Sequence, residues 1–543
     1  MSTDKGIPGS TGHNGDAASS IKAEEVVCIV KRPDVPGEYE VFSLEVSEDQ
    51  AAPFKLSQSY ATDLPRSLLD AFLVHGLPEY LQSSLSRRVH VLVSTRAGTG
   101  LASKFYESVL RPLLGSLGLS AQDGSASSEP EAGSPNPGCY NLVRTQDAES
   151  VRGFARKLSD GSTDGGEGTT KHTVVLLSGD GGIVEMLNGK APVDDAAAET
   201  PLPLIAMLPL GTGNALFNSL HKTVETPVGS AAPTVLVQAL RTLLKGKAAP
   251  LPSFKATFPD GSRTITYKET NAASSDAATG VEEQTDSVSH LYGAIVASYG
   301  FHSQLVWESD TPEYRKHGDK RFGMVAQELL KESHAYRATV EICSNNDGSS
   351  PRKLDREQHA YILATMVSNL EKTFCISPAS RPLDGRLRLV HFGPVGGERT
   401  MDIMMRAYDD GKHVDMSWTG VDSAEERVGY DEVTEVRITT LEEDARWRKY
   451  TRRETWANDR RDALAADLVL RVAFAGAKYR HASARACVGD NTCDLCAALQ
   501  AIQLETWDPP HEFAQNAGDQ IVAIPAGALL KHGLKLRRWD LEC

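Results

Sequence analysis

The sequence has no excess of basic side chains and no apolar run long enough to cross a bilayer. Its 543 residues contain 57 Lys and Arg against 72 Asp and Glu, a formal net charge of −15. Nucleic-acid binding needs a stripe of basic side chains that neutralises phosphates, so this balance argues against it. The longest apolar stretches, such as 173–177 and 202–210, are far shorter than the roughly 20 residues of a transmembrane helix. We therefore expect no transmembrane segment, and any anionic ligand must be bound locally.

The chain also lacks two C-x-x-C motifs that could form one zinc site, and it lacks the basic N-terminus followed by an apolar core that is typical of a secretory signal peptide. Eight scattered cysteines are typical of a reducing compartment, so we expect a cytoplasmic protein. Cys493 and Cys496 form a single C-x-x-C motif near Cys487 and His481. Without a second pair, free thiols are favoured over a zinc site, and we predict no metal held by such a cluster.

The length favours at least two domains with appendages. Residues 88–225 alternate short apolar runs with helical patterns, which is typical of a parallel sheet wrapped by helices. Short runs separated by Gly, Pro and Asp over 226–450 predict a mostly β sandwich domain. We expect strands and a helix, the latter over 68–81, in 21–87. The remaining predictions are a disordered tail over 1–20, surface loops over 121–138, 159–170 and 269–289, and an atypical C-terminal segment without strand rhythm over 451–543.

Three glycine-rich turns each follow a predicted strand, namely 89–93, 174–177 and 204–208. Because parallel strands end at one edge of a sheet, the turns should meet there. Glycine lets backbone N–H groups approach a phosphate, and the following helix presents its positive N-terminal end. The residues concerned are Ser94, Thr95, Gly98 and Gly100 in the first turn, Ser178, Gly179, Gly181 and Gly182 in the second, and Gly211, Thr212, Gly213 and Asn214 in the third.

Asp180 lies inside the second turn, where a carboxylate would repel a bound phosphate unless it holds a metal or accepts a proton. We predict that it is a general base. The alternative is that it caps the next helix, a role that aspartate fills well. Glu185, about one turn further on, either positions a nucleotide or faces solvent. Thr212 and Asn214 either donate to a phosphate or ribose, or cap their helix.

The sequence contains no G-x-x-x-x-G-K-[ST] motif and no H-R-D or D-F-G motif, which excludes a P-loop enzyme and a protein-kinase fold. The three turns together resemble the diacylglycerol kinase catalytic domain family of lipid kinases, and within it the sphingosine kinases most. STRAGTGLA from Ser94 is similar to the N-P-x-x-G-x-G-x-A of the family. SGDGGIVEMLNG from Ser178 and PLGTGNAL from Pro209 resemble its second and third turns, and YRKHGDKRF from Tyr314 resembles the Y-R-x-x-G-x-x-R-F of sphingosine kinases.

This resemblance implies an α/β nucleotide-binding domain followed by a β-sandwich that carries a lipid pocket. It implies ATP with Mg²⁺ as the phosphate donor, Asp180 as the base for a lipid hydroxyl, and a protein that associates peripherally with membranes. Arg315 and Arg321 are implied as phosphate contacts, and Thr145 as a residue near the nucleotide. From the residues alone, a surface ion pair of either arginine with Glu313 or Asp319 is as good an explanation.

Two departures from the family pattern bear on the substrate and on activity. Sphingosine kinases carry acidic residues where GFHSQLVWESD from Gly300 offers Gln304 and Val306. An ammonium head group would lack its counter-charge unless Glu308 or Asp310 supplied it, which favours a neutral acceptor such as diacylglycerol or ceramide. No Asp-Gly-Glu turn follows residue 450.

We therefore predict an ATP-dependent kinase that phosphorylates a hydroxyl of a sphingoid base or a diacylglycerol-like lipid. Two alternatives stay open. One is a kinase of a soluble acceptor such as NAD, since NAD kinases share a Gly-Gly-Asp-Gly turn. The other is a nucleotide-binding regulator without turnover, which the altered first turn and the missing Asp-Gly-Glu turn would fit.

Overall fold

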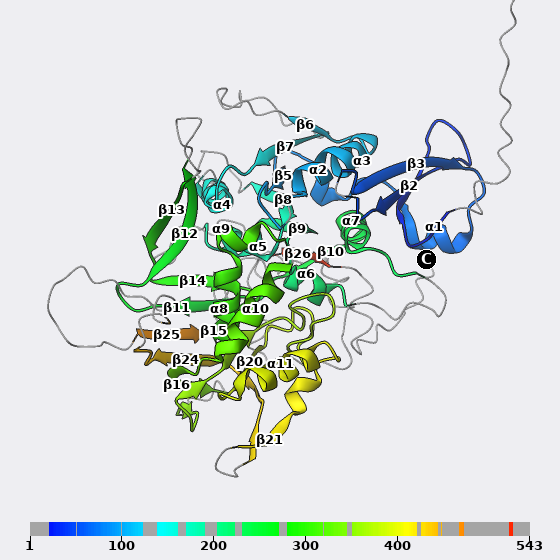
Figure 1. The fold of residues 1–543 in the computed structure, drawn as a ribbon. Coiled ribbons are helices and arrows are strands. Elements are labelled where there is room, and N and C mark those ends of the chain that lie inside the picture. The colour runs from blue at the N-terminus through cyan, green and yellow to red at the C-terminus, as the bar shows by residue number, and fades with distance from the viewer. Residues whose placement is uncertain are drawn as a thin grey trace, which may run out of the picture.

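The computed structural model describes fourteen parts of the chain, which hold nearly all of residues 21–443 and three short pieces beyond. They are 21–49, 51–98, 100–122, 138–160, 170–189, 203–222, 231–270, 280–318, 320–344, 350–420, 425–443, 447, 466–471 and 521–524. The predicted tail over 1–20 and the cysteines at 487, 493 and 496 lie outside them. Figure 1 shows an α/β unit, an N-terminal sheet on one side of it, and a β-rich domain on another side.

A mostly parallel seven-stranded sheet forms the centre of the α/β unit, in the order β10-β26-β9-β8-β5-β7-β6. Only β10, at one edge, runs antiparallel to its neighbour. The strands are β5 (Arg87–Val93), β6 (Ser120–Gln122), β7 (Cys139–Arg144), β8 (Lys171–Ser178), β9 (Leu204–Pro209), β10 (Lys247–Pro250) and β26 (Ile521–Ile524). The expected strands over 89–93, 174–177 and 204–208 are therefore present.

Helices cover both faces of this sheet because strand side chains alternate between them. Val91 of β5 points into the core beneath one set of helices, and its neighbour Leu92 points into the core beneath the other. The first set is α2 (Ala102–Phe105), a π-helical turn (Tyr106–Leu110), α3 (Arg111–Ser116) and α7 (Val235–Lys245). The second set is α4 (Ser150–Asp160), α5 (Asp180–Leu187) and α6 (Ala215–Leu220). This is the predicted parallel sheet wrapped by helices.

A four-stranded sheet in the order β3-β2-β1-β4 precedes this unit. Its elements are β1 (Val26–Lys31), β2 (Tyr39–Val46), β3 (Phe54–Ala61), α1 (Arg66–Phe72) and β4 (Leu73–Val74). Phe42 and Phe54 share a core with the helices over β5, so the small sheet docks on the α/β unit. The helix expected over 68–81 is wrong beyond Phe72, because residues 73–74 pair with β1 and Pro78 interrupts the helical backbone.

The β-rich domain consists of two mostly antiparallel sheets that share one core. One sheet has the order β14-β11-β25-β24-β16-β17, and β18 also pairs with β16. Its strands are β11 (Phe254–Thr257), β14 (His290–Gly293), β16 (Tyr336–Cys343), β17 (Arg352–Lys353), β18 (Gln358–His359), β24 (Glu435–Thr440) and β25 (Ala466–Arg471). The other has the order β15-β19-β20-β23, from β15 (Val296–Gly300), β19 (Tyr361–Thr365), β20 (Leu387–Phe392) and β23 (Gly429–Val433).

Helices α8 (Phe301–Ser309), α10 (Lys320–Glu332) and α11 (Gly396–Ala407) pack on this domain, and the short α9 (Pro312–Arg315) joins the first two. Val325, Leu329 and Ile403 anchor α10 and α11 in the shared core. Two hairpins, β12 (Arg263–Thr270) with β13 (Gly280–Ser287) and β21 (Ser417–Thr419) with β22 (Glu425–Arg427), extend from the domain.

Two sequence expectations need correction here. Residues 280–287 of the predicted loop over 269–289 pair with β12, where Thr264, Ile265 and Thr266 favour extended backbone. In the C-terminal segment over 451–543, β25 joins the β-rich domain between β11 and β24, and β26 enters the α/β sheet between β9 and β10. Such short strands carry little signal of their own, because the neighbouring strands supply their partners.

Candidate functional site

The three glycine turns lie side by side at one edge of the parallel sheet. Val93 is paired with Leu177, and Ser178 with Pro209, so β5, β8 and β9 end in register. The pairing continues into the turns, since Ser94 N–H donates to the Leu177 carbonyl at 3.0 Å and Leu210 N–H to the Ser178 carbonyl at 3.1 Å. The structure thus brings together the residues that the sequence singled out in all three turns.

The turns touch through their backbones, and this contact requires glycine. A Cβ atom at Gly179 would stand 2.8 Å from Gly211 Cα, and one at Gly98 would stand 2.6 Å from the Leu210 carbonyl oxygen. Gly98 also has a φ of +53°, which side chains disfavour. By contrast, a Cβ atom at Gly181 would meet nothing within 4 Å. Gly98, Gly179 and Gly211 therefore serve the contact between turns, whereas Gly181 faces open space.

Side chains of the first and third turns hold their own loops. Thr95 N–H donates to Thr145 Oγ1, and Thr95 Oγ1 donates to the Thr145 carbonyl, both at 2.9 Å. The predicted Thr145 thus ties the first turn to the end of β7. Asn214, in the left-handed conformation, accepts from Gly211 N–H at 3.0 Å and donates to the Gly211 carbonyl at 2.9 Å. Asn214 therefore closes the third turn on itself.

Asp180 is the first residue of α5, yet its carboxylate faces the third turn. Oδ2 accepts from Ala215 N–H at 2.7 Å and Oδ1 from Leu216 N–H at 3.1 Å, so it binds the N-terminus of α6. The capping alternative concerned the helix that begins at Asp180, whereas the carboxylate binds the start of α6, which follows a different strand. Burial raises the pKa of Asp180, while the two N–H donors act in the opposite direction. A small cavity of about 10 Å³ lies beside this carboxylate.

Glu185 and Asn188 point away from the turns. Arg152 of α4 donates to Glu185 Oε1 at 3.1 Å, so Glu185 joins two helices. Asn188 accepts from Tyr292 N–H and donates to the Tyr292 and Val184 carbonyls, each at 2.8 Å. This amide therefore connects the end of α5 to β14 of the β-rich domain. The structure gives both residues structural contacts.

The two predicted arginines share an acidic partner that the sequence did not single out for them. Arg315 donates to both carboxylate oxygens of Asp310, at 3.0 and 2.7 Å, and Arg321 approaches the same group at 3.8 Å. Glu313 forms no ion pair among the described residues, and Asp319 lies outside them. Arg321 is only 12% exposed, and its Nε has no hydrogen-bond partner in the described part of the chain. Their role at a phosphate stays a prediction.

A cleft of about 580 Å³ opens in front of the third turn. Thr212, Gly213 and Asn214 line one side of it, and residues of α10 and of the segment after β19 line another. Sequence reasoning missed those residues, because Lys320 and Phe322 were not singled out within their motif and the others come from unrelated segments. They are Lys320, Phe322, Gly323, Glu371, Lys372, Thr373 and Tyr408. The volume suits a small-molecule ligand, and two lysines favour an anionic one.

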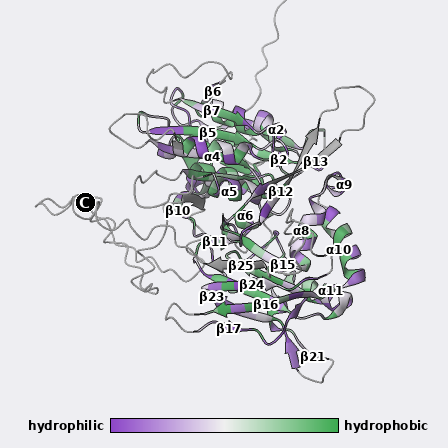
Figure 2. Ribbon diagram, turned by 90° about the vertical axis from the view of Figure 1, so that its left-hand side faces the viewer, coloured by the Kyte–Doolittle hydropathy of each residue, from purple (hydrophilic) through white to green (hydrophobic). Residues whose placement is uncertain are grey.

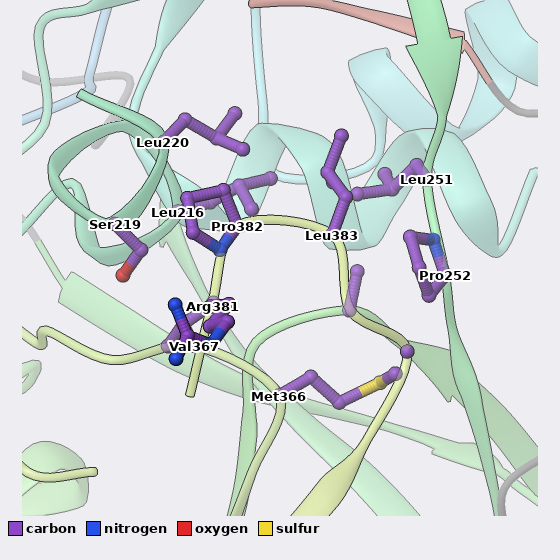
Figure 3. Close-up of a pocket in the computed structure, with 12 residues that line it drawn as sticks. Leu216, Ser219, Leu220, Leu251, Pro252, Met366, Val367, Arg381, Pro382 and Leu383 are labelled. Atoms are coloured by element: carbon purple, nitrogen blue, oxygen red, sulfur yellow. The ribbon is translucent and has the colours of Figure 1, made fainter. Parts of the chain in front are cut away.

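A second hollow lies at α6, between this helix and the β-rich domain (Figure 3). Leu216 and Leu220 of α6 face Met366 and Leu383 across it. Its volume of about 10 Å³ holds roughly one water molecule, so it is a packing gap at the domain junction.

The described residues contain no cluster of three or more His, Cys, Asp or Glu side chains arranged to hold a metal ion. None of their helices has both the length and the apolar character that a membrane crossing requires.

Residues 88–252 match the family model of the diacylglycerol kinase catalytic domain. This segment is therefore similar to a diacylglycerol kinase catalytic domain. No curated protein matches the chain. Solved structures from Bacillus anthracis str. Sterne that are named for diacylglycerol kinase resemble it. One has 14% identity and a TM-score of 0.40 over 71% of this chain and 91% of its own; another has 14% identity and a TM-score of 0.38 over 71% and 94%. The matched segment includes all three glycine turns and Asp180.

Proposed function

We propose that this protein is an ATP-dependent lipid kinase that phosphorylates a hydroxyl group. The observation that carries the proposal is the meeting of three glycine turns at one sheet edge, with Asp180 between them and a cleft of about 580 Å³ beside the third. The match to a lipid-kinase catalytic domain over the same segment supports it.

The nucleotide phosphates would bind the backbone N–H groups of the turns. Gly181 supports this, because a Cβ atom there would meet nothing within 4 Å and a phosphate can approach the backbone. Helix α5 supports it too, since its N-cap residue is Gly179, which has no side chain to cap the helix. Lys320 and Lys372 add positive charge across the cleft. Mg²⁺, when bound by the phosphate oxygens, would offset the phosphate charge.

Asp180 would accept the proton of the acceptor hydroxyl as its oxygen attacks the γ-phosphorus and ADP leaves. A carboxylate offers about four lone-pair directions, and the two α6 N–H groups occupy two of them. The raised pKa of Asp180 favours proton acceptance, because a more basic carboxylate is a better general base. The same N–H groups fix the orientation of the carboxylate before the substrate arrives.

We propose a neutral acceptor such as diacylglycerol. A sphingoid ammonium would need a free carboxylate near the start of α8, and both acidic side chains that the sequence offers are engaged. Glu308 accepts a hydrogen bond from the buried Gln304, and Asp310 pairs with Arg315. A sphingoid ammonium could pair with Glu308 or Asp310 only by displacing Gln304 or Arg315.

The test is Asp180→Asn, assayed with radiolabelled ATP and vesicles that contain diacylglycerol, ceramide or a sphingoid base. We expect calorimetry to show retained ATP binding, and transfer to lipid to fall by roughly 10²- to 10⁴-fold. Asp70→Asn, at a largely exposed aspartate of α1, is the matched control and should keep full activity.

Unchanged lipid phosphorylation by Asp180→Asn would remove this residue from the mechanism. Label in an aqueous product other than ATP and inorganic phosphate would identify a kinase of a soluble acceptor. ATP binding by the unsubstituted protein without transfer to any lipid would identify a nucleotide-binding regulator.

A further inference from the structure

The cleft lies where the α/β unit meets the β-rich domain, between α6 and the start of α10 (Figure 2). The charged side chains that line it are Lys320, at the start of α10, and Glu371 and Lys372, in the segment after β19. None of the three forms an ion pair with another described residue. All three charges are therefore available to a ligand in the cleft.

The backbone that carries Glu371 is fixed against α6. Leu370 N–H donates to the Phe374 carbonyl at 3.0 Å, which closes a tight turn around Glu371. Asn369 N–H donates to Ser219 Oγ of α6 at 3.0 Å, and the same Oγ donates to the Asn369 carbonyl at 3.2 Å. Both residues are buried. This turn of the β-rich domain therefore has a defined position relative to the α/β unit.

The turn also lies close to the Asp180 carboxylate. A Cβ atom at Gly213 would stand 3.2 Å from the Leu370 carbonyl oxygen and 3.9 Å from Asp180 Oδ2. The residue before Glu371 and the Asp180 carboxylate are thus both neighbours of Gly213. A nucleotide whose terminal phosphate lies at Asp180 would therefore extend along the third turn towards Glu371.

Tyr408 holds the Glu371 carboxylate in place. Its hydroxyl donates to Glu371 Oε2 at 3.3 Å, and its ring packs edge-on against Phe374, with 4.8 Å between the ring centroids. Burial and the neighbouring carboxylate raise the pKa of Tyr408 to about 12, so the phenol stays protonated and continues to donate at neutral pH. No described residue donates to Glu371 Oε1, which leaves this oxygen open to a ligand.

The lining of the cleft matches the three parts of a nucleotide. Lys320 and Lys372 suit phosphates, and the rings of Phe322 and Tyr408 offer faces on which a base can stack. A carboxylate accepts hydrogen bonds from ribose hydroxyls, as in dinucleotide-binding folds. An acyl chain would need apolar walls, whereas most residues that line the cleft are polar or charged. The cleft therefore favours a nucleotide over the chains of a lipid.

We infer that Glu371 accepts hydrogen bonds from the ribose hydroxyls of the bound nucleotide and that Tyr408 positions it. The inference rests on the proposed function, which supplies ATP as the phosphate donor. Glu371 then determines the specificity for ribose, although it lies in none of the motifs that the sequence offers. A nucleotide without these hydroxyls would leave the carboxylate facing it without a donor, which is costly in a site closed by a ligand.

The experiment measures the binding of ATP and of 2′,3′-dideoxy-ATP to the full-length protein by calorimetry. The unsubstituted protein should bind ATP roughly tenfold or more tightly, because hydrogen bonds to a charged group are the stronger kind. Glu371→Ala should lose this factor for ATP and keep its affinity for the dideoxynucleotide. Tyr408→Phe should reduce the preference for ATP by a smaller factor. Glu398→Ala, at an exposed glutamate of α11 outside the cleft, is the matched control and should keep the full preference.

Four outcomes would overturn the inference. The first is equal binding of the two nucleotides by the unsubstituted protein, and the second is an undiminished preference for ATP in Glu371→Ala. The third is a loss of the same size for both nucleotides, which a structural role or a phosphate contact would cause. The fourth is unchanged ATP binding with a raised KM for the lipid, which would place the acceptor against Glu371.

These measurements separate the inference from the proposed function. Calorimetry does not depend on phosphate transfer, so a protein that prefers ATP through Glu371 but phosphorylates no lipid would refute only the proposed function. A protein that phosphorylates a lipid and binds both nucleotides equally would refute only the role of Glu371.

Discussion

Replacing Gly179 with alanine tests whether the three turns must touch. Gly179 has φ −93° and ψ −166°, a backbone conformation that alanine adopts without strain. The added methyl group would stand 2.8 Å from Gly211 Cα, whereas carbon atoms pack at about 3.5 Å or more. The second and third turns would therefore have to separate by about 0.7 Å.

We expect Gly179→Ala to cost about 1–3 kcal/mol in the free energy of unfolding, the usual penalty for overpacking, measured by urea denaturation. Nucleotide affinity should fall as well, because the same shift displaces the N–H groups at the sheet edge. The obstructing atom, Gly211 Cα, belongs to the backbone, so rotation of a side chain cannot relieve the clash.

Gly181→Ala is the matched comparison two residues further on. A Cβ atom there meets nothing within 4 Å, and the position lies in the first turn of α5. Stability should rise by roughly 0.5–1 kcal/mol, since alanine is the better helix former. ATP affinity should nevertheless decrease, because the methyl group occupies the space through which a phosphate approaches. Equal stability of Gly179→Ala and the unsubstituted protein would refute the contact argument.

Two further predictions concern stability. Asn188→Asp keeps the acceptor for Tyr292 N–H but places a carboxylate next to the Tyr292 and Val184 carbonyl groups. The free energy of unfolding at pH 8 should therefore fall by about 2 kcal/mol or more. Unchanged stability would mean that this link between α5 and β14 contributes nothing. The second concerns acid. Burial lowers the pKa of His90 to about 3, against about 6.5 in the unfolded chain, so its stabilising effect is complete above pH 6.5 and is lost as the pH falls towards 3. The free energy of unfolding should be measured by urea titration between pH 6 and pH 4 for His90→Leu and the unsubstituted protein. Its slope against pH should be shallower for His90→Leu by up to about 1.4 kcal/mol per pH unit. Identical slopes would contradict a neutral His90 in the folded state.

The alternation of strands and helices over 88–225 and the position of the glycine turns could be predicted from the sequence. Both depend on local patterns, and strands of a parallel sheet necessarily end at a common edge. The reason given for the glycines was only partly right. Gly179 and Gly211 are required mainly by each other, and no local pattern reveals a contact between turns that lie 32 residues apart.

The partner of each polar side chain was decided by tertiary packing. Asp180 binds the start of α6, Glu185 pairs with Arg152, and Asp310 forms ion pairs with both predicted arginines. The second wall of the cleft and the strands β25 and β26 likewise depend on segments far away in the sequence. Hydrophobic periodicity fixes which face of an element is buried, but it carries no information on which distant donor or acceptor will stand opposite. The partner of each polar side chain is decided only by tertiary packing, because every polar group that becomes buried needs a hydrogen-bond partner.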